Sequence, residues 1–298
     1  MFTQVEFPSE GATLRGRLYV RPASRPLPVV VMAHGLSATI SGMTADRYAE
    51  AFRDAGFAVL LFDHKNFGIS DGEPRQQINK WVQARGYRDA MTFLASRPDI
   101  DGERMALWGD SMSAAEVIVV GSVDARVKAV VAQVPACGDQ PPPPDPDGSL
   151  FAAIREKLLS GDVSGTRENT FGPLPIVSTD QKGTPSILKA PTAYRWFTEH
   201  GCRFGSKWEN TATLVAPATP NAVLCAAHHK APLLIVYSPE DEMGGCNPAI
   251  TRMAFEVAPG PKALFETAGG HFGMLYHPSS LFDQAARAQR EFLFEHLM

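Results

Sequence analysis

The segment from Met105 to Val120 constrains the fold of this chain more than any other part of the sequence. Residues 105–108 are typical of a short buried strand, and residues 114–120 of a helix that is apolar except for Glu116. Only residues 109–113 join the two elements, so the chain must bend sharply between them. A bend of this kind strains its middle residue and points that side chain out at the top of a sheet. Ser111 takes the middle position and is the candidate nucleophile.

The positions two before and two after Ser111 must be small, because the helix and the strand pass close together there. Gly109 satisfies this requirement. Ser113 stands where the common Gly-x-Ser-x-Gly pattern has its second glycine, but serine is also small. The motif is short, and a serine in an ordinary strand-to-helix turn is the alternative interpretation. The rest of the chain has to decide between them.

Strands and helices alternate along most of the chain, which predicts an α/β protein with a mostly parallel sheet flanked by helices. Residues 2–7 and 14–20 suggest a hairpin at the sheet edge. In a parallel sheet the ligand site lies beyond the carboxyl ends of the strands. We expect buried strands at residues 28–33, 57–62, 105–108, 127–134, 232–237 and 263–265, and helices near residues 44–52, 77–94, 114–120, 247–257 and 281–297.

The alternation breaks at residue 137, where a proline-rich stretch, residues 138–148, excludes regular structure. We interpret residues 137–229 as an inserted, largely helical cap over the site, and residues 1–136 and 230–298 as the core domain. The alternative is a peripheral decoration far from the chemistry. Some apolar and aromatic residues of the cap should line the substrate pocket, while most hold the cap on the core: Phe151, Leu158, Leu159, Tyr194, Trp196, Phe197 and Trp208.

A serine hydroxyl needs an adjacent base, normally a histidine that a buried carboxylate orients. The expected chain order after such a turn is serine, acid, histidine. Asp241 comes four residues after the end of a predicted strand, and His271 lies in a glycine-flanked loop after the last one. Glu240 and Glu242 are the alternative acids. All three acids could also simply solvate a turn.

The tetrahedral intermediate of acyl transfer needs backbone donors. The N–H of Met112 follows the candidate nucleophile and opens a helix, whose dipole favours negative charge. The N–H of Leu36 is the expected second donor, and Ser37 is the neighbouring alternative. His34 and Gly35 before them suit an oxyanion loop, although an ordinary turn would look the same.

The chain resembles an α/β-hydrolase over nearly its whole length. It is similar to the branch that contains dienelactone hydrolases, serine-aminopeptidase-like lipases and Xaa-Pro dipeptidyl-peptidase-like esterases. The resemblance implies a Ser111–His271–Asp241 triad and no cofactor, and Ser113 departs from the common pattern. The segments that carry it are residues 33–36, 62–72, 109–113, 239–241 and 269–272.

We therefore expect a serine hydrolase that cleaves a carboxylic ester through an acyl-enzyme. A thioesterase, an amidase or peptidase, and a C–C bond hydrolase would use the same triad. A non-catalytic ligand receptor with this fold would normally have lost a triad member. An epoxide hydrolase or dehalogenase would need an aspartate where Ser111 stands.

The net charge and the composition limit the kinds of partner and the cellular location that we expect for this protein. The net charge of −4 predicts no nucleic-acid surface. No secretory signal is visible, and no apolar run reaches the ~20 residues of a membrane span. The cysteines, which lack metal-ligand spacing, indicate reduced thiols, a cytoplasmic location and no metal; they are Cys137, Cys202, Cys225 and Cys246. The expected partner is a small ester-like substrate, and a homo-oligomer is compatible with the sequence.

Overall fold

An eight-stranded sheet forms the centre of the protein, in a computed structural model that describes residues 1–40, 44–163, 170–201, 211–215 and 220–298. The strand order is β1-β2-β4-β3-β6-β7-β10-β11. The neighbours from β4 to β11 are parallel, and β2 runs antiparallel to both β1 and β4. The predicted α/β architecture with a mostly parallel sheet is confirmed. The strands are β1 (Thr3–Ser9), β2 (Ala12–Tyr19), β3 (Leu27–Ala33), β4 (Ala58–Phe62), β6 (Ile100–Asp110), β7 (Val127–Gln133), β10 (Leu233–Tyr237) and β11 (Lys262–Glu266).

The antiparallel edge begins with the hairpin that the sequence predicted. Glu10 and Gly11 form its two-residue turn, and both have a positive φ, 48° and 72°. A two-residue turn with positive φ at both positions matches the twist of the flanking strands. The interior strands differ from this hairpin because they are buried on both faces, as in β4, where every residue is buried.

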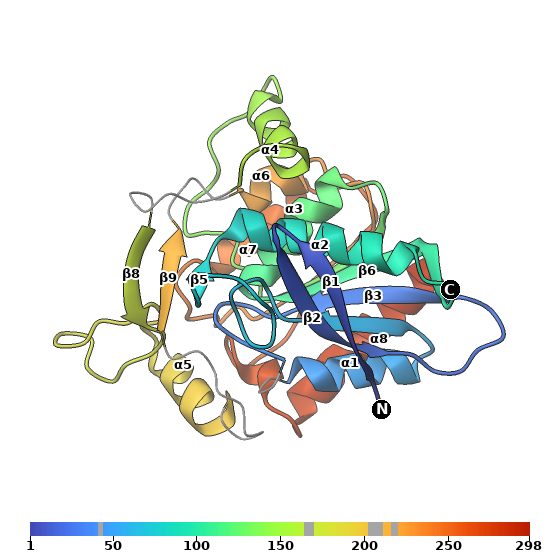
Figure 1. The fold of residues 1–298 in the computed structure, drawn as a ribbon. Helices are drawn as coiled ribbons and strands as arrows, with labels where there is room; N and C mark the ends of the chain where they lie inside the picture. Colours follow the sequence, from blue (N-terminus) through green and yellow to red (C-terminus); the bar gives the residue numbers. More distant parts are fainter. Residues whose placement is uncertain (41–43, 164–169, 202–210, 216–219) are drawn as a thin grey trace.

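Helices cover both faces of the sheet (Figure 1). Helices α1 and α8 pack on one face, and α2, α3 and α7 pack on the other. Within the described part of the chain, no helix combines the length and apolar character needed to cross a membrane. The helices of this layer are α1 (Ala45–Asp54), α2 (Lys80–Ala95), α3 (Met112–Val123), α7 (Pro248–Val257) and α8 (Ser280–Leu297).

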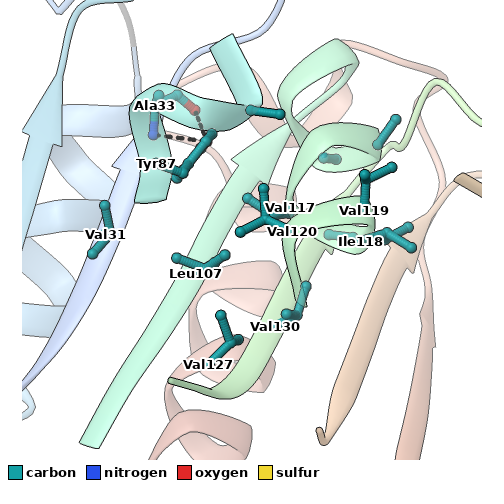
Figure 2. Packing of buried hydrophobic residues seen from close by; sticks show 14 of the residues in the cluster. Val31, Ala33, Tyr87, Leu107, Val117, Ile118, Val119, Val120, Val127 and Val130 are labelled. Atoms are coloured by element: carbon teal, nitrogen blue, oxygen red, sulfur yellow. Dashed lines mark hydrogen bonds between the residues drawn. The ribbon is translucent and has the colours of Figure 1, made fainter. Parts of the chain in front are cut away.

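Helix α3 is mostly apolar, with Glu116 as its one charged residue, because neighbouring elements contact it on several sides. It contacts strands β6 and β7 beneath it and helices α2 and α6 beside it. Figure 2 shows Val117 and Val120 of this helix packed over Leu107 and Val130 of the sheet. Burying each such side chain contributes about 1.5–3 kcal/mol. The helix that follows Ser111 is therefore firmly anchored at its position.

Tyr87 of α2 ties together the two strands that carry site residues. Its hydroxyl donates to the carbonyl of Trp108 at 2.9 Å and accepts from the N–H of Ala33 at 3.1 Å, and Figure 2 shows the contact with Ala33. These bonds link the carboxyl ends of β6 and β3. The start of α2 is set by Asn79, whose side chain accepts from the first N–H groups of the helix. This cap explains why the helix begins later than the predicted residue 77.

Residues 137–229, interpreted from the sequence as an insertion and called the insertion below, contain helices, as expected, and also two strands that the sequence did not predict. In a separate sheet of order β5-β9-β8, β9 pairs with β8 on one side and with the short β5 of the core on the other. The residues of β8 include a glycine and two prolines, so they show no strand pattern. The elements of this region are α4 (Ser149–Leu159), β8 (Thr170–Pro175), α5 (Pro191–Arg195), a π-helix (Trp196–Gly201), β9 (Thr211–Val215) and α6 (Ala222–Ala226). The core also contains β5 (Gln77–Ile78) and a short 3₁₀ helix (Gly273–Leu275).

Candidate active site

The chain turns at Ser111, between the end of β6 at Asp110 and the start of α3 at Met112. Ser111 has φ 55° and ψ −116°, a conformation that costs a non-glycine residue about 1–3 kcal/mol. Two backbone bonds hold it there. Its N–H donates to the carbonyl of Gln133 at 2.8 Å, and its carbonyl accepts from the N–H of Ala136 at 3.0 Å. The strained turn expected from the sequence is confirmed for the backbone.

The small residues on either side of Ser111 have different roles. A Cβ atom at Gly109 would lie 2.4 Å from the carbonyl oxygen of Ser113, so only glycine fits. Ser113 is fully buried and uses its hydroxyl as a hub. The hydroxyl contacts the carbonyl of His34, Nε2 of His64 at 2.9 Å and Oε2 of Glu116 at 3.0 Å. The departure from glycine at this position therefore adds a polar network behind the turn.

The structure brings Ser111, His271 and Asp241 into one chain of hydrogen bonds. Nε2 of His271 lies 3.0 Å from Oγ of Ser111, and Nδ1 lies 2.8 Å from Oδ2 of Asp241. The side chains of His271 and Asp241 are only 3% and 4% exposed. Three residues from the ends of three different strands thus meet at the carboxyl edge of the sheet.

The three neighbouring acids take different positions. Asp241 contacts the imidazole, and its other oxygen accepts from the N–H of Met243 at 3.0 Å. Glu242 accepts from the backbone N–H of His271 at 3.0 Å, so it holds the main chain of the histidine loop. Glu240 is exposed. The sequence did not indicate the contact made by Glu242, because no pattern distinguishes an anchoring acid from a solvated one.

Several groups act on the protonation of His271. Burial disfavours the charged imidazolium, but the Cys246 sulfur and the Asp241 carboxylate outweigh burial and raise the pKa of His271 well above its ordinary value. Cys246 is buried beside the pair and was not singled out in the sequence. The pKa shift favours an imidazole that takes up a proton readily.

Among the described residues, Asp241, Cys246 and His271 form the cluster that could offer ligand atoms to a metal ion. Their candidate ligand atoms lie within 4.8 Å of one another. Both ring nitrogens of His271 are already engaged in hydrogen bonds, to Asp241 and to Ser111. An ion bound here would have to displace one of those partners. The arrangement is therefore suited to moving a proton.

The loop after β3 approaches Ser111 closely. A Cβ atom at Gly35 would lie 2.9 Å from Cβ of Ser111, so glycine is required for the approach. The N–H of Gly35 donates to Oδ1 of Asp110 at 3.1 Å, which holds the loop, and burial raises the pKa of Asp110 to about 6. Leu36 and Met112 both line the cavity in front of Ser111. The first N–H groups of a helix lack intrahelical acceptors, so that of Met112 is available to an oxyanion.

Two other histidines near the site are buried and cannot readily act as bases. Burial lowers the pKa values of His34 and His64 to about 3. Both rings are therefore neutral and rarely protonated at physiological pH. His277, six residues after His271, packs its ring against Phe282, 4.7 Å between centroids.

A cavity of about 260 Å³ opens in front of Ser111. Both the core and the insertion contribute to its wall, and most of the lining side chains are apolar. From the core come Leu36, Met112, Ala115, Val119 and Met243, with the polar exceptions Lys80 and Glu116. From the insertion come Cys137, Gly138, Leu188, Pro220, Asn221 and Ala222.

The large cap residues were expected mostly to hold the cap on the core and in a few cases to line the pocket. Trp196 stacks on Phe272, 5.3 Å between ring centroids, and its indole N–H donates to the carbonyl of Leu275 at 3.1 Å. Phe151 stacks on His228 at 3.8 Å. None of the described members of that set lines the cavity at Ser111, which corrects the expectation. Those members are Phe151, Leu158, Leu159, Tyr194, Trp196 and Phe197, while Trp208 lies outside the described residues.

This fold and this arrangement of residues define an α/β hydrolase, a class of hydrolase-type enzymes. The family described as serine aminopeptidase, S33, matches residues 24–271, and the chain belongs to it. The fold is similar to that of the protein DcsB, solved with its substrate analogue, with a TM-score of 0.74 and 24% identity over 99% of this chain and 100% of that one. The resemblance inferred from the sequence is confirmed at the level of the superfamily.

Curated relatives include several enzymes of acyl chemistry. The chain is 42% identical to "Thiohydrolase aneE" of Aspergillus aculeatus over 135 residues. This matched segment covers 45% of this chain and 42% of that protein. The chain is 34% identical to a thiohydrolase of Eupenicillium brefeldianum over 217 residues. This matched segment covers 70% of this chain and 67% of that protein. The chain thus spans less than half the length of the first of these relatives.

Proposed function

We propose that this protein hydrolyses a carboxylic ester through an acyl-enzyme formed on Ser111. The observation that carries the proposal is the continuous contact from Ser111 through His271 to the buried Asp241. A hydroxyl that shares its proton with a carboxylate-oriented imidazole can become a nucleophile at neutral pH. The adjoining cavity, with its mostly apolar lining, suits the acyl part of a small substrate.

The reaction has two balanced steps. In the first, Oγ of Ser111 attacks the ester carbonyl carbon, its proton passes to Nε2 of His271, and the same proton leaves with the alcohol. In the second, water loses a proton to His271 and attacks the acyl carbon, and Ser111 Oγ leaves with that proton as the acid departs. Asp241 stabilises the imidazolium in both steps. The N–H groups of Leu36 and Met112 bind the negatively charged carbonyl oxygen.

A thioester is the second candidate substrate. It is favoured by the relatives called thiohydrolases, to which parts of this chain are 42% and 34% identical. The same two steps apply, with a thiol as the leaving group in place of the alcohol. Whether the enzyme prefers an ester or a thioester depends on how the leaving group is bound. Kinetics with matched ester and thioester substrates would distinguish the two.

The test combines labelling with a substrate panel. A fluorophosphonate probe should add one label to the wild type and none to Ser111→Ala, while Ser96→Ala, which changes a serine at the end of α2, should label normally. p-Nitrophenyl esters of increasing length and the matched thioesters then rank the two chemistries by kcat/KM. A label on a peptide that lacks Ser111, or equal turnover by Ser111→Ala, would refute the nucleophile.

We also propose a small-molecule partner and a reducing compartment such as the cytoplasm. The first rests on the size of the cavity, about 260 Å³. The second rests on Cys137, Cys225 and Cys246, which are free thiols. Thiols of this kind persist where glutathione and thioredoxin keep cysteines reduced.

A further inference from the structure

Two polar side chains that the proposed reaction does not use, Lys80 and Asn221, line the cavity at Ser111. Lys80 is the first residue of α2, and Asn221 is the N-cap residue of α6. Both helices contact α3, the helix that begins just after Ser111. Helix α2 also contacts β3 and β6, whereas α6 contacts α7, which packs on β10, so α2 and α6 flank α3 on opposite sides. The two side chains therefore reach one cavity from opposite flanks of α3.

The ammonium group of Lys80 has no hydrogen bond or ion pair among the residues that the structure describes. The side chain is half-buried, and Nζ is not one of the enclosed nitrogen atoms that lack a partner, so it keeps accessible surface. The first turn of a helix is also an unfavourable place for a cation, because the positive end of the helix dipole lies there. Neither an ion pair nor the helix itself therefore explains a lysine at this position.

Asn221 offers a second donor, whose direction is fixed by the helix cap. Its Oδ1 accepts from the N–H of Leu224 at 3.0 Å, which leaves the amide nitrogen as the end available to another partner. Within the described part of the chain Nδ2 has no such partner, and it too keeps accessible surface. Asn221 can therefore donate a hydrogen bond to a ligand in the cavity without giving up the cap of α6.

Glu116, the acid in the same wall, does not cancel the charge of Lys80. Its carboxyl group is only 2% exposed. Burial raises the pKa of Glu116 to about 8, although the Ser113 hydroxyl and the charge of Lys80 act in the opposite direction. The neutral acid therefore predominates at physiological pH. Lys80 then carries the charge of the described cavity lining, which is otherwise mostly apolar.

We propose that Lys80 and Asn221 bind a carboxylate at the far end of the acyl chain, so that the enzyme prefers half-esters of dicarboxylic acids. This inference rests on the proposed function, because the acyl chain stays on Ser111 through both steps. A carboxylate has two acceptor oxygens and no donor, which matches an ammonium and an amide nitrogen. A cationic group on the substrate would be repelled by Lys80, and a neutral carbonyl would not use its charge. The apolar part of the lining suits the methylene chain between the two ends.

The test uses pairs of methyl esters of increasing acyl length, in which the far end of the chain is either a carboxylate or the primary amide of the same size. Chromatography of the released acid gives kcat/KM for each member. For the wild type, kcat/KM should favour the carboxylate by roughly 10- to 100-fold at the best length, the value of a hydrogen bond to a charged group.

Three variants assign the preference to these side chains. Lys80→Met, which removes the charge and keeps the length, should abolish the preference, whereas Lys80→Arg should retain most of it because the charge remains. Asn221→Asp keeps the oxygen that caps α6 but replaces the donor with a negative oxygen, so it should also lower the preference. The matched control is Lys128→Met, the same change at an exposed lysine of β7 that does not line this cavity, which should keep the wild-type ratio.

The outcomes separate this inference from the proposed function. If fluorophosphonate does not label Ser111 of the wild type, the proposed function fails and this inference fails with it. If labelling proceeds and the wild type shows no carboxylate preference at any chain length, this inference alone is refuted, even where Lys80→Met does not fold. A preference that survives in folded Lys80→Met, or one that arises only when the carboxylate is on the alcohol, would also overturn it.

Discussion

Asp241 and Glu242 are neighbours in sequence, but they hold different atoms of the same histidine. Asp241 contacts the imidazole at 2.8 Å, whereas Glu242 holds the backbone N–H at 3.0 Å. We expect Asp241→Asn to lower kcat by about 10⁴, because an amide favours the wrong tautomer of His271. Glu242→Gln should lower kcat by less than about tenfold, since its amide oxygen still accepts from a neutral donor.

Steady-state kinetics with circular dichroism, to verify folding, would check this prediction. Fluorophosphonate labelling rates give a second readout, because they report the reactivity of Ser111 without the second chemical step. Equal losses of kcat in the two variants would contradict the prediction, because Glu242 would then do more than hold the backbone of the histidine loop in place.

The raised pKa of His271 predicts where activity appears on the pH scale. The imidazole must be neutral to act as a base, and its reference pKa is about 6.5. A raised pKa keeps the ring protonated to higher pH, so the rising limb of kcat/KM should have its midpoint above pH 6.5.

Cys246 supplies the matched variant for this profile. Because its sulfur raises the pKa of His271, Cys246→Ala should move the midpoint to lower pH. Cys225→Ala, which changes a buried thiol on α6, should leave the midpoint unchanged. A rising limb at or below pH 6.5 in the wild type would contradict the direction of the pKa shift.

Sequence reasoning named Ser111, His271 and Asp241 because each follows a strand, and parallel strands bring their carboxyl ends together. Cys246 and Glu242 could not be named in the same way. Each acts through one contact that depends on the path of a loop, and single cysteines and acids occur in many loops without such contacts. The hydrogen-bond network around Ser113 could not be predicted either, because only the structure shows which buried groups surround its hydroxyl.

At the scale of elements, the junction of β6 and α3 depends on the absence of a side chain at Gly109. A Cβ atom there would lie 2.4 Å from the backbone oxygen of Ser113, which cannot move without shifting the helix. We expect Gly109→Ala to lower the free energy of unfolding by about 1–3 kcal/mol, the usual cost of overpacking. Activity should fall as well, because α3 carries the N–H of Met112.

Gly102 in the same strand is the control for this prediction. A Cβ atom at Gly102 would make its nearest contacts at 3.5 Å, which is ordinary van der Waals distance. Gly102→Ala should therefore change the stability by no more than about 0.5–1 kcal/mol. Urea denaturation of both variants checks the pair, and similar losses would show that the close approach at Gly109 is not the cause.

The elements that the sequence located well are those with a strong local pattern. Strand β4 and helix α8 have continuous burial or a regular apolar stripe. Strand β8 was missed because it contains a glycine and two prolines. Strand β9 was missed because one of its partners, β5, lies far away in sequence and is two residues long. A local pattern does not reveal a pairing partner of this kind, so the insertion was expected to be largely helical.

At the scale of the whole molecule, the insertion meets the core in two ways. Trp196 and Phe197 pack with Phe272 in a buried cluster beside the histidine loop, so these aromatic residues hold the insertion in place. Smaller side chains, among them Leu188 and Ala222, reach the cavity. From the sequence, most of the large apolar and aromatic residues of the cap were expected to hold it on the core and a few to line the pocket. Trp196 and Phe197 meet the first expectation. The residues that do reach the cavity could not be named from the sequence, because they follow no local pattern.

Leu188 is the insertion residue that best tests control of substrate choice. Its backbone N–H bonds the carbonyl of Ile176 at 2.9 Å, so an alanine there keeps the local pairing while the side chain withdraws from the cavity. We expect Leu188→Ala to shift the ester preference toward longer acyl chains by about tenfold in the ratio of kcat/KM values, because one methylene in an apolar pocket is worth about 1–3 kcal/mol. Tyr194→Ala, an exposed change in the same insertion that does not touch the cavity, should keep the parent profile. Fluorophosphonate labelling of Ser111 should be the same in both variants, which separates pocket shape from chemistry. An unchanged chain-length profile in folded Leu188→Ala would mean that the insertion does not shape the acyl site.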